Sequence, residues 1–168
     1  MLINLGCGDR YAGGWVNVDH AGSPHKKDLT LDITGELPWK PGSVLHVYMG
    51  HVLEHLTVAQ ARALLKKIRP LVRPEGQILV VGPDVEVAQA MANVGTLEVT
   101  MDSLRFGGNR WPGDEHRWEC TAEKVAKLLK ATGWGSIENV GINNVAGFWP
   151  VADRNPQWQC AITARNDK

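Results

Sequence analysis

Residues 2–8 have the sequence Leu-Ile-Asn-Leu-Gly-Cys-Gly, and this stretch decides the fold. The apolar residues up to Leu5 predict a short buried strand, and the glycines at positions 6 and 8 predict a tight turn after it. Glycine adopts positive φ and lets a ligand approach the backbone closely. In an open α/β sheet such a turn lies at the carboxyl end of the first strand, where ligands bind. The sequence therefore predicts a ligand site at Gly6, Cys7 and Gly8.

A second short strand, residues 15–18, ends at Asp19. An acidic residue at this place typically binds a nucleotide ribose. The turn departs from the dinucleotide-binding pattern G-x-G-x-x-G, because Tyr11 stands where the third glycine belongs. Only ten residues separate Gly8 from Asp19, too few for a strand and a full crossover helix. We therefore expect a loop or a single helical turn between the first two strands.

The rest of the sequence alternates strands with helices. Strands are expected at residues 29–33, 44–49, 77–81, 137–140 and 159–163, and helices are expected from Thr57, Asp84 and Thr121. Thr57 and Gln60 have the spacing of a capping box, and apolar residues follow them at helical spacing. This alternation predicts an α/β fold with a Rossmann-like, doubly wound, mostly parallel sheet and a shortened first crossover. The length predicts a single domain, residues 1–168.

Composition narrows the function further. The formal net charge is +0, which gives no long-range attraction to nucleic acids or membranes. No apolar run approaches the roughly 18 residues of a membrane-spanning helix, and Met1 leads straight into a strand, so no signal peptide is expected. The three cysteines show no C-x-x-C spacing. We expect a cytoplasmic protein with neither a disulfide framework nor a cysteine zinc site.

Several segments that follow strands should converge at one edge of the sheet. The segments NLGCG, VNVD, LDI, HVLEHL and RPEGQILVVGPD occur in this order. In this order they resemble a class I S-adenosylmethionine-dependent methyltransferase, of the small type with a "vLEHL" segment after the fourth strand. The resemblance covers residues 2–84 and, more loosely, residues 121–134, which end in Gly-Trp.

The resemblance implies S-adenosylmethionine as the cofactor and transfer of its methyl group to an acceptor. It implies that Asp19 accepts hydrogen bonds from the ribose hydroxyls and that Asp32 and Ile33 lie beside the adenine. The backbone of Gly50 and His51 would face the amino group of the cofactor. The residues implied to bind the cofactor are Leu5, Gly6, Cys7, Gly8, Asp19, His20, Asp32, Ile33, Gly50 and His51.

Residues 51–55 also match H-x-x-E-H, a zinc-peptidase pattern. That pattern needs His51 and His55 on one face of a helix, whereas the capping box starts the helix only at Thr57. No metal ion is therefore expected. Glu54 and His55 have a plainer alternative role, in which they tie this loop to neighbouring backbone.

The acceptor side should be formed by the loop at residues 106–118, which follows the fifth strand. His116 is predicted as the general base and His51 as a second catalytic residue, because a histidine exchanges protons near neutral pH. Trp111, Trp118 and Trp149 are candidates to line a pocket, or else they close the core or an interface. The acceptor is unidentified, and a small molecule is expected rather than a nucleic acid.

Two other functions remain as alternatives. A protein that keeps this fold for binding, with weak or lost turnover, is suggested by the short first crossover. A nicotinamide-dependent oxidoreductase is disfavoured by Tyr11 at the third glycine position and by the LEHL segment at residues 53–56.

Overall fold

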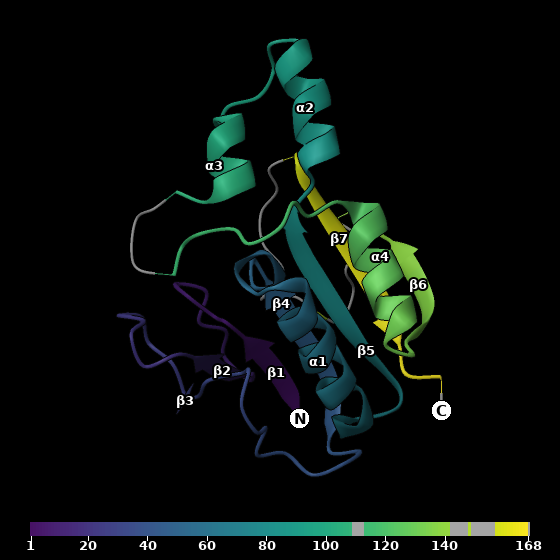
Figure 1. Cartoon of the computed structure of the whole chain (residues 1–168). Coiled ribbons are helices and arrows are strands. Elements are labelled where there is room, and N and C mark those ends of the chain that lie inside the picture. The colour runs from purple at the N-terminus through teal and green to yellow at the C-terminus, as the bar shows by residue number, and fades with distance from the viewer. Residues whose placement is uncertain (109–112, 142–147, 149–156, 168) are drawn as a thin grey trace.

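The protein is built on a seven-stranded sheet with the strand order β3-β2-β1-β4-β5-β7-β6 (Figure 1). The computed structural model describes residues 1–108, 113–141, 148 and 157–167. The strands are β1 (Leu2–Leu5), β2 (Val16–Asp19), β3 (Leu29–Thr30), β4 (Val44–Gly50), β5 (Val72–Pro83), β6 (Gly135–Asn139) and β7 (Gln159–Arg165). The first five strands run parallel, and β7 runs antiparallel to both β5 and β6. The predicted mostly parallel α/β sheet is confirmed.

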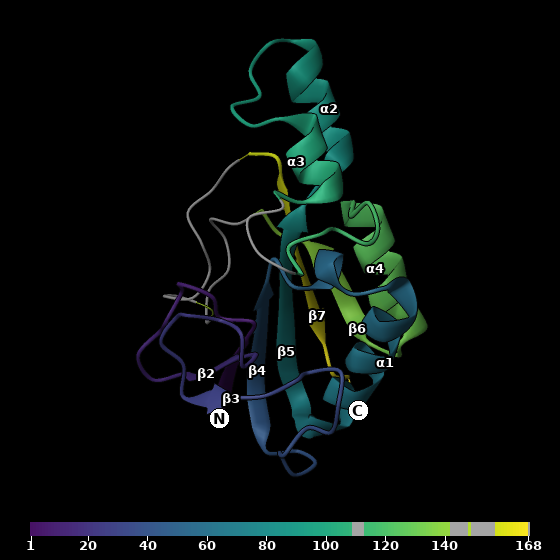
Figure 2. The same ribbon diagram turned by 60° about the vertical axis from the view of Figure 1, so that its left-hand side comes forward.

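Four helices and two single turns connect the strands. The helices are α1 (Val58–Ile68), α2 (Val85–Asn93), α3 (Met101–Phe106) and α4 (Ala122–Ala131), and the 3-10 turns are η1 (Leu53–His55) and η2 (Arg69–Leu71). Figure 2 shows α1 and α4 on the same side of the sheet, whereas α2 and α3 extend beyond the end of β5. Within the described ranges, no helix is both long and apolar enough to cross a membrane.

Helix α1 begins as its sequence predicts. The Gln60 N–H donates to the Thr57 hydroxyl at 3.2 Å, and the Thr57 N–H donates to the Gln60 side chain at 2.9 Å. These two bonds form the capping box and satisfy backbone donors that the helix itself leaves unpaired. The buried face consists of Ala61, Leu64, Leu65 and Ile68. Val58 fits the same apolar spacing, but it lies in the first turn and is 45% exposed.

Two strand boundaries differ by more than two residues from those predicted. Strand β3 ends at Thr30 rather than at residue 33, because the Asp32 side chain accepts hydrogen bonds from the backbone and hydroxyl of Thr34 and forms a turn. Strand β5 begins at Val72 rather than at residue 77, because the expected turn at residues 74–76 is a bulge inside the strand. Glu75 has a φ of 63° at this bulge.

Two hydrophobic cores lie on opposite faces of the sheet. The larger one packs the sheet against α1 and α4, and its fully buried members include Leu5, Met49 and Leu64. The smaller one consists of Ala12, Trp15, Tyr48, Leu79, Val81, Phe148 and Ala161, all from strands or loops. No helix of the described residues contributes to this second core. Loop side chains therefore cover the face opposite α1 and α4.

The shortened first crossover is confirmed. Residues 6–15 form turns and irregular backbone without a helix. A buried amide supports this loop, because the Asn17 side chain donates to the backbone oxygens of Ala12 and Trp15 at 3.0 and 2.9 Å and accepts from the Ala12 N–H. The Asn4 side chain donates to Asn17 at 3.1 Å. Hydrogen bonds from the Asn17 side chain therefore fix the backbone of this crossover, which contains no helix.

Candidate functional site

The candidate site lies where the strand order changes direction, between β1 and β4. Ligands of open α/β sheets bind at such a switch point, outside the carboxyl ends of the strands. Leu5 pairs with Met49, so the two strands end level with each other. The Gly6–Gly8 turn follows β1, and His51 follows β4. The structure thus brings these two predicted segments together.

Both glycines of the turn have backbone conformations that other residues rarely adopt. Gly6 has a φ of +68° and Gly8 a φ of +51°. A Cβ at Gly6 would lie 2.5 Å from Cγ2 of Val52, whereas a Cβ at Gly8 would have no heavy atom within 4 Å. The Gly6 and Cys7 N–H groups both donate to the Val18 backbone oxygen, at 2.8 and 3.0 Å. Gly6 is therefore needed for packing, and Gly8 leaves open space above the turn.

Asp19 ends β2, as predicted, and it is buried against this turn. Its Oδ2 accepts the Gly8 N–H at 2.9 Å, and its Oδ1 accepts the His20 N–H at 2.8 Å. The residue is 8% exposed. A carboxylate oxygen accepts more than one hydrogen bond, so each oxygen keeps acceptor capacity for a hydroxyl group.

The other residues predicted to bind the cofactor differ in their burial and in the groups that they contact. Leu5 lies in the larger core and offers only its backbone to a ligand, and Cys7 is buried beside the Lys26 backbone oxygen. The His20 side chain is exposed. Asp32 lies in the turn after β3, where its hydrogen bonds to Thr34 hold its pKa below the usual value. The roles implied for these residues toward a cofactor remain predictions.

The three cysteines should react slowly with alkylating agents. Burial, with a smaller contribution from the charge of Asp19, raises the pKa of Cys7 to about 11, and burial raises the pKa of Cys160 to about 12. Burial also raises the pKa of Cys120. Since the thiolate is the reactive form, each thiol stays protonated at pH 8. Intact-mass measurement after iodoacetamide treatment should show no adduct on the folded protein and three after urea unfolding. Rapid labelling of a folded thiol would contradict this.

A buried carboxylate holds the side chain of His51. Nδ1 of His51 lies 2.9 Å from Oε1 of Glu54, which is 1% exposed. Burial raises the pKa of Glu54, but the hydrogen bond and charge of His51, the charge of His55 and a backbone hydrogen bond together lower it by more, so the pKa lies below its usual value. Nε2 of His51 lies 2.6 Å from the Gln159 amide, and the ring packs edge-on against Trp158. His51 itself has a φ of 56°, a conformation that is uncommon outside glycine and concentrates at functional sites.

The sequence alone does not reveal these partners. The H-x-x-E spacing predicts that His51 and Glu54 lie near each other, but it suggests metal ligands or a tie to backbone rather than a side-chain pair. Gln159 and Trp158 come from the far end of the chain and carry no motif. The predicted tie to backbone is confirmed for His55, because its Nδ1 lies 3.3 Å from the Glu115 backbone oxygen.

The loop before α4 brings His116 to the same sheet edge. The Arg117 N–H donates to the Glu54 backbone oxygen at 2.7 Å, and the rings of His116 and His55 meet edge to face with centroids 5.0 Å apart. Nδ1 of His116 lies 2.8 Å from the Leu104 backbone oxygen. Trp111 and Trp149 lie outside the described residues.

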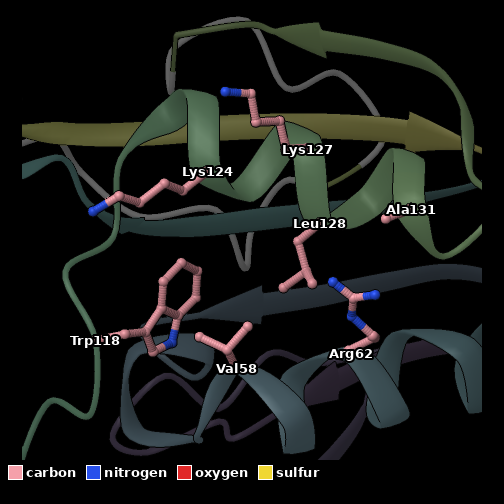
Figure 3. A pocket seen from close by; sticks show the side chains of 7 residues that line it. All are labelled: Val58, Arg62, Trp118, Lys124, Lys127, Leu128 and Ala131. Atoms are coloured by element: carbon pink, nitrogen blue, oxygen red, sulfur yellow. The ribbon is translucent and has the colours of Figure 1, made fainter.

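Trp118 packs against the larger core, which is one of the two roles predicted for it. Its indole N–H donates to the Leu53 backbone oxygen at 2.7 Å, and its ring packs against the larger core. Figure 3 shows it at a pocket between α1 and α4, whose lining residues are Val58, Arg62, Trp118, Lys124, Lys127, Leu128 and Ala131. None of these residues follows directly after a strand, so this pocket is distinct from the switch point.

Comparison with solved structures finds similar folds. The S-adenosylmethionine-dependent methyltransferase SibL, in its apo form, has a TM-score of 0.60 at 14% identity, over 99% of this chain and 50% of that one. Human N-acetylserotonin methyltransferase in complex with S-adenosylmethionine has a TM-score of 0.61 at 15% identity, over 98% and 46%. A methyltransferase from Archaeoglobus fulgidus, also S-adenosylmethionine-dependent, has a TM-score of 0.65 at 13% identity, over 98% and 85%.

The chain spans about half the length of the first two of these proteins. No family model and no curated protein matches the sequence. The likeness to solved structures shows the fold, which is the Rossmann-like fold of S-adenosylmethionine-dependent methyltransferases.

Proposed function

We propose that this chain is a methyltransferase that binds S-adenosylmethionine at the Gly6–Gly8 turn and transfers the methyl group to a small-molecule acceptor. The observation that carries the proposal is the buried Asp19 carboxylate beside a glycine turn at the switch point of a methyltransferase fold. The open space above Gly8 leaves room for a ligand against the backbone. The carboxylate supplies the acceptor oxygens that a ribose diol requires.

The hydrogen bonding of the turn favours this cofactor over a dinucleotide. Pyrophosphate groups are held by free backbone N–H groups at a glycine-rich turn and helix N-terminus. Here the N–H groups of Gly6, Cys7 and Gly8 already donate to Val18 and Asp19, and no helix follows the turn. These contacts support a cofactor without phosphates and disfavour a nicotinamide dinucleotide.

When bound, S-adenosylmethionine would supply a methyl group activated by its positively charged sulfur, and S-adenosylhomocysteine would be the leaving group of the in-line transfer to the acceptor. Such a step depends mainly on how the chain positions the two reactants. A general base is needed only where the acceptor must lose a proton. We assign this role to His51 rather than to His116, because the Glu54 carboxylate orients the His51 ring at 2.9 Å and stabilises it when it takes up a proton. In this role the acceptor replaces the Gln159 amide, which lies 2.6 Å from Nε2 of His51.

Replacing Asp19 by alanine should weaken binding of S-adenosylmethionine at least about tenfold, because a hydrogen bond to a charged group contributes roughly 1.5–3 kcal/mol. Calorimetric titration measures this directly. Asp9→Ala is the matched control, since Asp9 lies in the loop between β1 and β2 with a side chain that is 74% exposed, and it should bind the cofactor like the wild type. Equal affinities of the Asp19→Ala and wild-type proteins would contradict the assignment. The alternative of a binding protein without turnover predicts tight cofactor binding but no formation of S-adenosylhomocysteine with any acceptor.

A further inference from the structure

Three side chains outside the proposed cofactor pocket form a cluster with the composition of a metal site. They are Glu54 and His55 in η1 and His116 in the loop before α4. One carboxylate oxygen and one nitrogen of each ring all lie within 4.8 Å of one another. Glu54 is buried, and the two histidines are partly exposed. The cluster thus combines a buried anion with two ligands that solvent can reach.

Both histidines have the hydrogen bonding that metal ligands usually show. Nδ1 of His116 lies 2.8 Å from the Leu104 backbone oxygen, and Nδ1 of His55 lies 3.3 Å from the Glu115 backbone oxygen. A carbonyl oxygen only accepts, so in the neutral ring each Nδ1 carries the proton and each Nε2 has the lone pair that a metal requires. A histidine that binds a metal typically donates its other ring N–H to a backbone oxygen or a carboxylate. The backbone here fixes the tautomer that such a ligand requires.

Glu54 supplies the second, independent observation. Its Oε1 is bound by His51, whereas Oε2 is buried and has no hydrogen-bond partner among the described residues. Buried carboxylates are stabilised by pairing with cations or by coordinating metals, and the contact with His51 leaves Oε2 of Glu54 available to a cation. The buried carboxylate oxygen of Glu54 and the lone pairs of the two histidine rings are therefore suited to bind a cation.

We propose that Glu54, His55 and His116 bind one divalent cation of the first transition row. Two imidazoles with one carboxylate form the ligand set of catalytic zinc and of non-haem iron sites, in which further positions stay open for water or a substrate oxygen. Imidazole ligands select zinc or cobalt over magnesium. Ligand atoms around a tetrahedral zinc lie about 3.4 Å apart, so binding draws the three side chains together by about an ångström.

This ligand set differs from the H-x-x-E-H pattern and goes beyond the proposed methyl transfer. In that pattern His51 and His55 would both bind the metal. Here His51 does not bind it but contacts Oε1 of the ligand Glu54. His116 is the ligand that sequence spacing does not reveal, because it reaches the cluster only through the fold. The expectation that this chain binds no metal ion concerns the H-x-x-E-H pattern and the spacing of the cysteines, and neither of these includes His116.

The test uses the metal alone and no methyl donor, so it fails or succeeds independently of the proposed function. The full chain is stripped with a chelator, dialysed and titrated with Zn²⁺ by calorimetry and with Co²⁺ by visible absorption. We expect one ion per chain, weak competition by Mg²⁺, and a melting temperature that rises with Zn²⁺ concentration. His55→Ala and His116→Ala should each lower the affinity by more than about 100-fold, the upper range for loss of a second-shell partner.

Matched controls separate this site from other metal binding. His25→Ala removes an exposed histidine outside the cluster and should bind like the wild type. Glu54→Gln keeps the side-chain volume and should lose binding, and His51→Gln should lower the affinity only about 10- to 100-fold. Circular dichroism verifies folding, and the more exposed histidine variants decide the test if Glu54→Gln fails to fold. No 1:1 binding at about 100 μM Zn²⁺, or wild-type affinity in His116→Ala, would overturn the proposal.

Discussion

Replacing Phe148 by alanine should destabilise the protein by about 3–5 kcal/mol, the typical cost of deleting a buried aromatic ring. Phe148 is 0% exposed, and its ring centroid lies 6.0 Å from that of Trp15 and 5.1 Å from that of His46. The smaller core has no described helix behind it, so neighbouring elements have little means of closing the cavity. Urea denaturation monitored by circular dichroism should show the loss as a lower midpoint at similar slope.

The sequence offers a matched control, because it contains only two phenylalanines. Phe106 ends α3 and is 60% exposed. Phe106→Ala should therefore change the free energy of unfolding by no more than about 0.5 kcal/mol, as is usual for surface substitutions. If the two variants were equally stable, Phe148 would not anchor the second face of the sheet.

The smaller core also shows where sequence patterns stop being informative. The capping box of α1, the apolar strands and the short first crossover follow local rules, so most boundaries are predictable to within two residues. Trp15 and Phe148 meet on one face of the sheet only in the folded chain, and nothing in their neighbouring residues indicates it. The bulge at residues 74–76 is missed for a related reason, since a turn signal inside a paired strand resembles a turn before one.

The candidate site likewise contains residues that the sequence predicts and contacts that it does not predict. Gly6, Gly8 and Asp19 are predictable because strand ends of a parallel sheet converge, and their spacing marks those ends. The side chain of Asp19 is also used within the protein, to hold the Gly8 N–H, which no motif specifies. The sequence predicts that Glu54 ties its loop to neighbouring backbone, whereas its side chain is buried and contacts His51. Its burial depends on the loop before α4, which closes over it through Arg117.

Replacing Gly6 by alanine should destabilise the protein by about 2–5 kcal/mol, which is the sum of two separate costs. A residue with a side chain at a φ of +68° costs roughly 1–2 kcal/mol, and overpacking against a core side chain costs about 1–3 kcal/mol. The overpacking arises because the new Cβ would lie 2.5 Å from Cγ2 of Val52. Gly8→Ala is the control for the first cost, because Gly8 has a φ of +51° and open space around it.

A double-mutant cycle separates the two costs. In a Val52→Ala background the methyl group at position 6 no longer meets Cγ2, so Gly6→Ala should cost only the backbone strain, about 1–2 kcal/mol. The coupling energy between positions 6 and 52 should therefore be about 1–3 kcal/mol in favour of the double variant. Urea denaturation of the four proteins measures it, and strictly additive effects would show that Val52 does not close over the turn. The same contact ties the Gly6–Gly8 turn to the loop after β4, so a large coupling would mean that the two halves of the candidate site are held in place by one packed pair.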